Sequence, residues 1–314
     1  RLVIGKKEII QSIEREKIVN FMQNNYHPSK MVVSAAGKIN HEQFVQRISD
    51  SMINLPKGKI IERVKALYKG GEYREDKTLE QIHLVLGFKG LDFYDEDYYA
   101  LKIYSAIMGA GMSSRLFQEI REKRGLVYSI HTSSRSFYDT GTFQVFAGTG
   151  EKQIQELIPV LCDELQNAPK NLTDKEIEKS KTQLRSATLM ATESTMSNAA
   201  IAVHQIFTKE KLINIEETLE KIKNVSKSSI EKAAKKLLSS KPTVSSIGPI
   251  KKLESPTFNG ITLLAPFSEA NSIARSTDSM EPLITIWSPV LTLDIYAPES
   301  SAIEESNSSS IPRT

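Results

Sequence analysis

The sequence is poor in the features that mark disulfide-bonded, membrane-spanning or nucleic-acid-binding proteins. Its 314 residues include one cysteine, so no disulfide can form within the chain. No apolar run approaches the roughly 20 residues that a helix needs to cross a bilayer. The 41 Lys and Arg residues nearly balance the 38 Asp and Glu, which leaves a net charge of +3. A charge this small indicates neither nucleic acid nor an anionic membrane as a partner.

The sequence also lacks the local patterns of a metal or nucleophile site. No histidine has a second one four residues away, so neither His-Glu-x-x-His nor His-x-x-Glu-His occurs. His41-Glu42 imitates the start of the first pattern, but Val45 occupies the place of the second ligand. We therefore expect no metal ligands and no cofactor-binding residues in this chain. The five histidines are His27, His41, His83, His131 and His204.

Two further features have ordinary explanations. Cys162 lies beside an apolar stripe that includes Ile158 and Leu165, and we expect a buried core thiol. Gly109-Ala110-Gly111 precedes a helix, as a phosphate-binding loop would, but the Lys-[Ser/Thr] of a P-loop is absent. A plain turn between two helices is the favoured interpretation.

Hydrophobic periodicity predicts an α+β protein with helices layered on a largely antiparallel sheet. The segment 1–55 contains an amphipathic helix over 8–24, a short buried strand over 31–36 and a helix from about Asn40. A polar connection follows over 54–79. The predicted strands beyond it are 81–88, 126–134, 141–147 and 243–248, and the predicted helices are 95–108, 113–125, 151–167, one that opens with a Thr173/Glu176 capping box, one with an apolar stripe over 196–207, and 228–238.

The last part of the chain differs in composition. Residues 251–314 are rich in Ser, Pro and Thr, show no helical period and end in an acidic, Ser-rich stretch. This composition is typical of poorly ordered segments. We therefore expect a disordered tail.

The segment from Ser113 to Ser129 is the candidate for chemistry. Arg121 is expected near the exposed end of a helix, Gly125 permits a sharp reversal, and Tyr128 enters the next strand. A guanidinium and a phenol on the same side of one edge could bind a peptide carbonyl and stabilise an oxyanion. The residues alone favour a simpler interpretation, because Arg at a helix end complements the dipole and Tyr suits a strand.

The same segment resembles a known family. The sequence G-A-G-M-S-S-R-L-F at 109–117, followed by R-x-x-x-G-L-x-Y-S at 121–129, is similar to the hallmark of the pitrilysin/insulinase zinc metallopeptidases. The similarity is greatest to their bacterial and mitochondrial processing-peptidase branch. The segment Y-H-P-S-K-M-V-V at 26–33 resembles the same family's strand near the end of its first domain, with Lys30 where Asn is usual. The match runs in consistent order from about Gly5 to Pro249.

The resemblance implies two related α+β domains. The first would bind zinc through an inverted His-x-x-Glu-His helix, and the second would supply an Arg/Tyr pair to a facing half or subunit. By position, Arg121 and Tyr128 match that pair, in a supporting role toward the substrate carbonyl. Residues 1–55 match only the end of the zinc domain, 56–74 a linker, and 75–250 the whole second domain, while 251–314 match nothing in the family.

This resemblance leads to a functional expectation. The chain is the substrate-binding portion of a zinc endopeptidase that hydrolyses peptide bonds, inactive alone, with zinc supplied by the complete enzyme or a partner. Its expected partners are a peptide and a facing half in a homo- or heterodimer. The alternatives are a non-catalytic scaffold subunit and a remnant of a broken gene. Because the chain opens at Arg1 without a targeting signal, its true start is expected to be missing. A bacterial cytoplasm or periplasm is favoured over the mitochondrial matrix.

Overall fold

The architecture is built on one five-stranded sheet in the strand order β1-β5-β2-β4-β3. The computed structural model describes residues 5, 7–28, 31–55, 64–250, 257–258 and 261–262. Three of the four strand pairings are antiparallel, and only β1 and β5 run parallel. The predicted α+β class with a largely antiparallel sheet is therefore confirmed. The strands are β1 Gly71–Asp76, β2 Ile82–Gly90, β3 Ser129–Ser136, β4 Gly141–Thr149 and β5 Thr243–Gly248.

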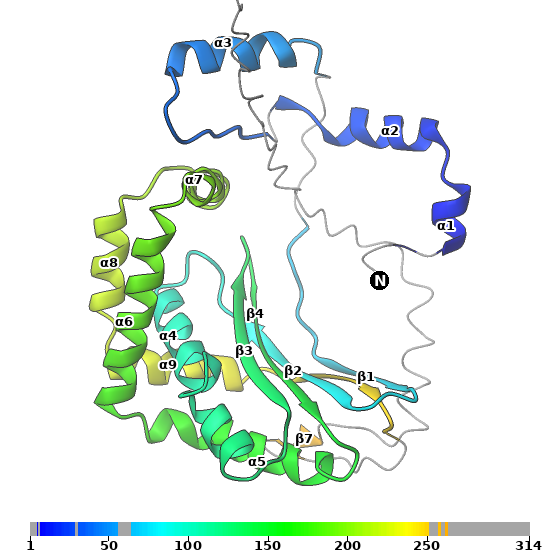
Figure 1. Cartoon of the computed structure of the whole chain (residues 1–314), viewed down its shortest axis with the longest axis vertical. Helices are drawn as coiled ribbons and strands as arrows, with labels where there is room; N and C mark the ends of the chain where they lie inside the picture. Colours follow the sequence, from blue (N-terminus) through cyan, green and yellow to red (C-terminus); the bar gives the residue numbers. More distant parts are fainter. Residues whose placement is uncertain are drawn as a thin grey trace, which may run out of the picture. The chain divides into compact units, whose positions relative to one another are not determined.

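Helices cover one face of this sheet (Figure 1). Helix α4 packs on β3 and α9 on β2, while α6 contacts α4, and α8 contacts α6 and α4. This places α4 and α9 in a layer on the sheet with α6 and α8 outside them. The helices are α4 Tyr98–Gly109, α5 Ile154–Asn167, α6 Asp174–Ala191, α7 Thr195–Lys209, α8 Ile215–Lys223 and α9 Lys227–Leu238.

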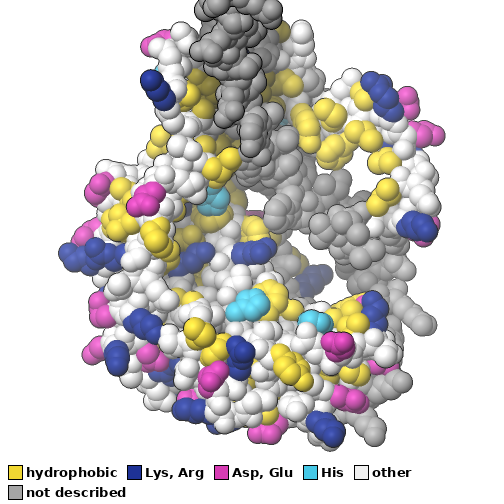
Figure 2. All heavy atoms as spheres, viewed as in Figure 1, with side chains coloured by type: hydrophobic (Ala, Val, Ile, Leu, Met, Phe, Trp, Pro, Cys, Tyr) yellow, Lys and Arg dark blue, Asp and Glu magenta, His cyan; other side chains and the backbone are white. Residues whose placement is uncertain are grey.

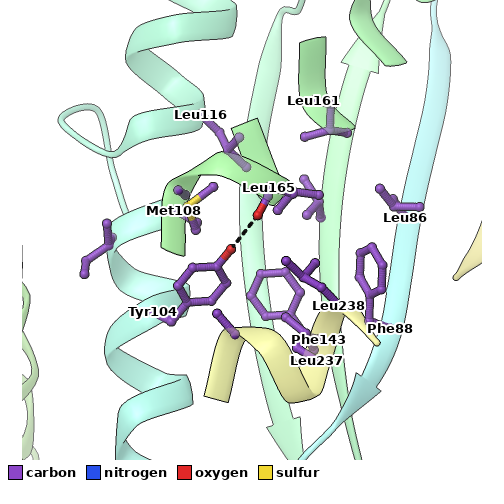
Figure 3. Close-up of a cluster of buried hydrophobic side chains, with 14 of the residues drawn as sticks. Leu86, Phe88, Tyr104, Met108, Leu116, Phe143, Leu161, Leu165, Leu237 and Leu238 are labelled. Atoms are coloured by element: carbon purple, nitrogen blue, oxygen red, sulfur yellow. Dashed lines mark hydrogen bonds between the residues drawn. The ribbon is translucent and has the colours of Figure 1, made fainter. Parts of the chain in front are cut away.

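The core lies between this sheet face and the helices (Figure 3). Alternate residues of β2, such as Leu86 and Phe88, point into it and meet Phe143 of β4. Tyr104 of α4 is fully buried among them, and its hydroxyl donates a hydrogen bond to the Leu165 carbonyl at 3.3 Å. Each such side chain contributes roughly 1.5–3 kcal/mol through burial, so this cluster dominates the stability of the sheet domain.

Cys162 belongs to the same core, as predicted. Its side chain is buried in α5, and burial, together with the neighbouring Asp163 carboxylate, raises the pKa of the thiol to about 12. A thiol held protonated in this way is a poor nucleophile, so Cys162 acts as a packing residue.

The first 55 residues are organised differently. The predicted helix over 8–24 is two helices, α1 Lys7–Ser12 and α2 Arg15–Asn25, and α3 spans His41–Met52. None of the three helices has a buried side chain. The predicted buried strand over 31–36 is wrong, since these residues are extended but join no sheet and are half-buried or exposed. A strand needs a hydrogen-bonded neighbour, and the described residues offer none here.

Some elements of the sheet domain were not expected. Strand β1 lies inside the segment that the sequence predicts as a connection, and it pairs with β5 from the far end of the domain. Helix α8 had no predicted counterpart. The apolar stripe of α7 is also less buried than expected, because Val203 is its only buried apolar side chain. The predicted disordered tail over 251–314 lies outside the described residues, apart from the short pair β6 Thr257–Phe258 and β7 Ile261–Thr262.

Candidate functional site

The segment between α4 and β3 forms a π-helical turn in place of the predicted regular helix. The π-helix η2 spans Phe117–Glu122, with the Lys123 amide donating to the Gln118 carbonyl at 3.0 Å. It is fixed to the core by Ile120, which is fully buried, and the chain reverses three residues after its end, at Gly125, which has a left-handed φ of +62°. Single π-helical turns are frequent at functional sites because they re-aim the side chains that they carry.

Arg121 lies on the exposed side of this turn. Its guanidinium carbon is 4.7 Å from the centroid of the Phe117 ring, a cation–π contact between residues four apart in the chain. The Arg121 carbonyl accepts a hydrogen bond from the Gly125 amide at 3.1 Å, which ties the backbone to the reversal. The guanidinium makes no hydrogen bond or ion pair with any residue that the structure describes. Its donors are therefore available to a ligand.

Tyr128 lies at the other end of the reversal, directly before β3. Its amide donates to the Gly148 carbonyl of β4 at 2.8 Å, which holds the backbone against the sheet. The preceding residues Leu126 and Val127 are buried, whereas the Tyr128 side chain is 65% exposed. Within the described part of the chain, the phenol has no hydrogen-bond partner. Both predicted site residues are thus exposed donors on one anchored turn.

The start of the turn is bonded to helix α6. Arg115 donates from Nε to Glu176 Oε1 at 2.5 Å and from Nη2 to Oε2 at 2.8 Å, and also to the Asn171 carbonyl at 2.5 Å. Glu176 closes the predicted capping box with Thr173. Partial burial alone would raise the pKa of Glu176, but the hydrogen bonds from Arg115 and Thr173 outweigh it and lower the pKa to about 2. The carboxylate therefore remains charged and holds the turn against α6.

The glycines before the turn serve packing. Helix α4 ends at Gly109, and a Cβ there would lie 2.4 Å from the Thr132 amide of β3. Gly111 has a left-handed φ of +85°. The close approach and the backbone reversal explain these two residues, so the predicted plain turn is confirmed.

The uncovered face of the sheet carries residues that sequence reasoning missed. Cross-strand neighbours His131 of β3 and Phe146 of β4 stack with ring centroids 4.8 Å apart and an interplanar angle of 8°. Phe146 is in turn opposite Val85 of β2. Histidine and hydrophobic side chains lie together over the strands (Figure 2). Strict alternation along β2 and β4 was the available signal, since the residues between the buried ones must face the other side.

The described residues do not fit a zinc centre. No group of three or more His, Cys, Asp or Glu side chains in that part of the chain could hold a metal ion. Nor does any helix there combine the length and the apolar composition that a bilayer requires. Arg121 and Tyr128 remain the candidate site residues, and their role stays a prediction.

Comparison with known proteins places this arrangement in a family. The sequence profile described as "Peptidase M16 inactive domain" matches residues 12–184. An uncharacterized zinc protease of Rickettsia bellii is 32% identical over 248 residues, which cover 79% of this chain and 60% of the relative. The beta subunit of the mitochondrial-processing peptidase of Dictyostelium discoideum is 28% identical, with 80% and 56% covered. The chain thus spans about three fifths of the length of these relatives.

Solved structures agree on the fold. The peptidase M16 inactive domain from Pseudomonas fluorescens superposes with a TM-score of 0.68 at 22% identity, covering 80% of this chain and 61% of the other. A protease from Helicobacter pylori gives a TM-score of 0.64 at 20% identity, covering 78% and 61%. The resemblance first noted at the Arg121–Tyr128 segment is confirmed, and the chain belongs to the peptidase M16 family of zinc metallopeptidases.

Proposed function

We propose that this chain is the substrate-side portion of a zinc-dependent endopeptidase, in which Arg121 and Tyr128 hold the carbonyl of the scissile peptide bond. The observation that carries the proposal is the exposure of both donors on one turn whose backbone is anchored on either side. A pre-organised guanidinium and phenol stabilise the negative charge that develops on a carbonyl oxygen during hydrolysis, without reorganising at the moment of reaction.

Zinc and the group that activates water would come from elsewhere. The relatives are named zinc proteases, and the described residues offer no ligand cluster. We propose that a facing family half, on a longer form of this chain or on a second subunit, supplies the metal, and that this chain is inactive alone. Peptide is the proposed substrate class, and the bacterial relatives favour a bacterial compartment.

Complementation tests this proposal. The whole chain is mixed with the zinc-bearing part of the Rickettsia bellii relative that it does not span, and cleavage of a fluorogenic peptide is followed. We expect hydrolysis only when both are present with zinc. Arg121→Ala should lower kcat about 10²–10³-fold, the usual effect of losing one oxyanion donor. Tyr128→Phe, which keeps the ring and removes the hydroxyl, should lower it by a similar factor.

Matched controls separate this role from general damage. Arg124→Ala removes a neighbouring exposed arginine that pairs with Glu119, and Tyr73→Phe removes an exposed hydroxyl that donates to Glu75. Both should leave kcat within about twofold. Restored cleavage that is indifferent to Arg121 and Tyr128 would favour the rival function, a scaffold subunit. Turnover by the chain alone with added zinc would contradict its inactivity.

A further inference from the structure

A second group of polar side chains lies near the far end of β3, beside the rings of Phe93, Tyr94 and Tyr98. Lys209 of α7 donates to the Phe93 carbonyl, and its ammonium is 4.4 Å from the centroid of the Tyr94 ring. His204, also of α7, packs edge-on against Phe93 with centroids 4.7 Å apart. Lys102 of α4 donates to the Ser134 carbonyl at 2.9 Å. Two helices and the loop after β2 thus bring three basic groups together.

This basic cluster, Lys102, His204 and Lys209, has no carboxylate bonded to it. None of its members forms an ion pair with an acidic residue among those that the structure describes. The charge of Asp92 acts on Lys209, but Asp92 Oδ1 already accepts hydrogen bonds from the amides of Tyr94 and Asp95.

The lysines of α9 do pair with carboxylates, so the lack of an acidic partner is not general among the lysines of this protein. Lys232 lies 3.3 Å from Asp97, and Lys236 lies 2.8 Å from Asp95 and 3.4 Å from Asp97. These lysines find carboxylates on the same loop that contributes Phe93. The carboxylates Asp95 and Asp97 of this loop thus pair with the lysines of α9 and with no member of the basic cluster.

The electrostatics of the cluster agree with its geometry. Burial lowers the pKa of Lys102, and burial and the charge of Lys221 lower the pKa of Lys209, against a smaller opposing effect of Asp92. Burial and the charges of Lys102 and Lys209 lower the pKa of His204. Half-buried cations that repel one another are costly unless an anion joins them. His204 is exposed, so an anion can reach the cluster from solvent.

We propose that Lys102, His204 and Lys209 form a binding site for a carboxylate or phosphate group. Each ammonium has three donors and gives one to a backbone carbonyl, which leaves donors for a ligand. Hydrogen bonds from an ammonium to a carboxylate or phosphate are charge-assisted and are stronger than neutral ones. A free anion would bind here whatever the role of Arg121 and Tyr128, whereas a peptide as the source of the anion rests on the function proposed for those two residues.

The anion has two possible sources, a free small molecule or an acidic side chain of a bound peptide. Ser134, which Lys102 contacts, follows Tyr128 by six residues along β3. An extended strand rises about 3.3 Å per residue, so the two positions are about 20 Å apart. A peptide lying along this edge would present a glutamate to the cluster about six residues from the carbonyl bound at Tyr128.

Histidine resonances of the whole chain test the site. With the five histidines labelled at Cε1, the titration of His204 is followed in chloride, acetate and phosphate at equal ionic strength. His204→Gln assigns its resonance, and His83 and His131 on the other sheet face are internal controls. We expect acetate and phosphate to move the midpoint of His204 alone to higher pH, because a bound anion favours the imidazolium.

Peptides separate the two sources. The His204 titration is compared between a seven-residue peptide with a terminal glutamate and the same peptide with glutamine in that position. A shift with acetate or phosphate identifies a site for free anions, and a shift with the glutamate peptide alone identifies a peptide side chain. Lys102→Met and Lys209→Met should each weaken binding about tenfold, the loss of one charge-assisted hydrogen bond, whereas Lys236→Gln should not. Unchanged His204 titration with every probe, equal shifts at all histidines, or binding that survives both methionine variants would overturn the proposal.

Discussion

The sheet domain over 71–250 and the segment over 7–55 contain amphipathic helices of similar quality, yet only the first has a core. Helices α4, α5 and α9 place apolar side chains in one core shared with β2 and β4, whereas α1, α2 and α3 bury none. Ile9, Ile18 and Phe21 remain about half exposed, at 57%, 47% and 55%. A helical stripe therefore indicates which face needs a partner, and the chain must also contain that partner for the face to be buried.

Hydrogen exchange should give the largest contrast between the two regions. Buried amides of α4 open only with the whole domain, so we expect protection of about 10⁴-fold or more, which corresponds to a typical domain stability. Amides of α2 should exchange within about tenfold of an unfolded peptide. Adding the part of the Rickettsia bellii relative that this chain does not span should slow amide exchange in α1–α3 and leave α4 unchanged. Equal protection of both regions in the isolated chain would contradict the comparison.

A pair of phenylalanine substitutions tests the same contrast energetically. Phe143→Ala should lower the free energy of unfolding by about 3–5 kcal/mol, because it removes a fully buried ring from the core. Phe21→Ala, at a ring that is 55% exposed, should change it by less than about 0.5 kcal/mol. Urea titration measures both. A comparable loss in the two variants would show that 7–55 shares the core.

Within the sheet domain, removing the ion pair between the turn and α6 should lower the free energy of unfolding by a smaller amount. Glu176→Gln replaces a bidentate, partly buried carboxylate and should cost about 1–2 kcal/mol at pH 7. Glu217→Gln at an exposed i,i+4 pair with Lys221 is the matched control and should leave the free energy of unfolding nearly unchanged, because solvent screens that pair. Thermal unfolding compares the two variants. An equal loss of stability in both would contradict a structural role for the Arg115–Glu176 ion pair.

The smallest expected effect is the change with pH in the stability that the Arg115–Glu176 ion pair contributes. The folded-state pKa of Glu176, about 2, lies below the ordinary value of 4.5, so the folded protein binds fewer protons there than the unfolded chain. Its contribution to stability is present above about pH 4.5 and is lost as the pH falls toward 2. The difference between the wild-type chain and Glu176→Gln should therefore shrink between pH 4.5 and 2. A constant difference over that window would show that charge is not the cause.

Local patterns predicted most of the sheet domain. The alternation of β2 and β4, the capping box of Thr173 and Glu176 and the buried position of Cys162 all follow from short-range rules. Strand β1 could not be predicted in this way. Its sequence G-E-Y-R-E-D is polar and charged, and its place is decided by pairing with β5, more than 160 residues further along the chain. The predicted strand over 31–36 fails for the opposite reason. Its apolar run is typical of a strand, but it has no neighbouring strand among the described residues.

For the candidate site, the sequence by itself determined the residue types and their spacing. Arg121, Gly125 and Tyr128 were identifiable before any coordinates because a glycine reversal and a family pattern are both local. Only the tertiary structure decided that the turn is π-helical, that Arg115 holds it to Glu176, and that Lys102, His204 and Lys209 lie beside the rings of Phe93, Tyr94 and Tyr98. The physical reason is that these contacts join elements far apart in the chain. Burial and pairing of charges depend on which surfaces meet, and no local period encodes that.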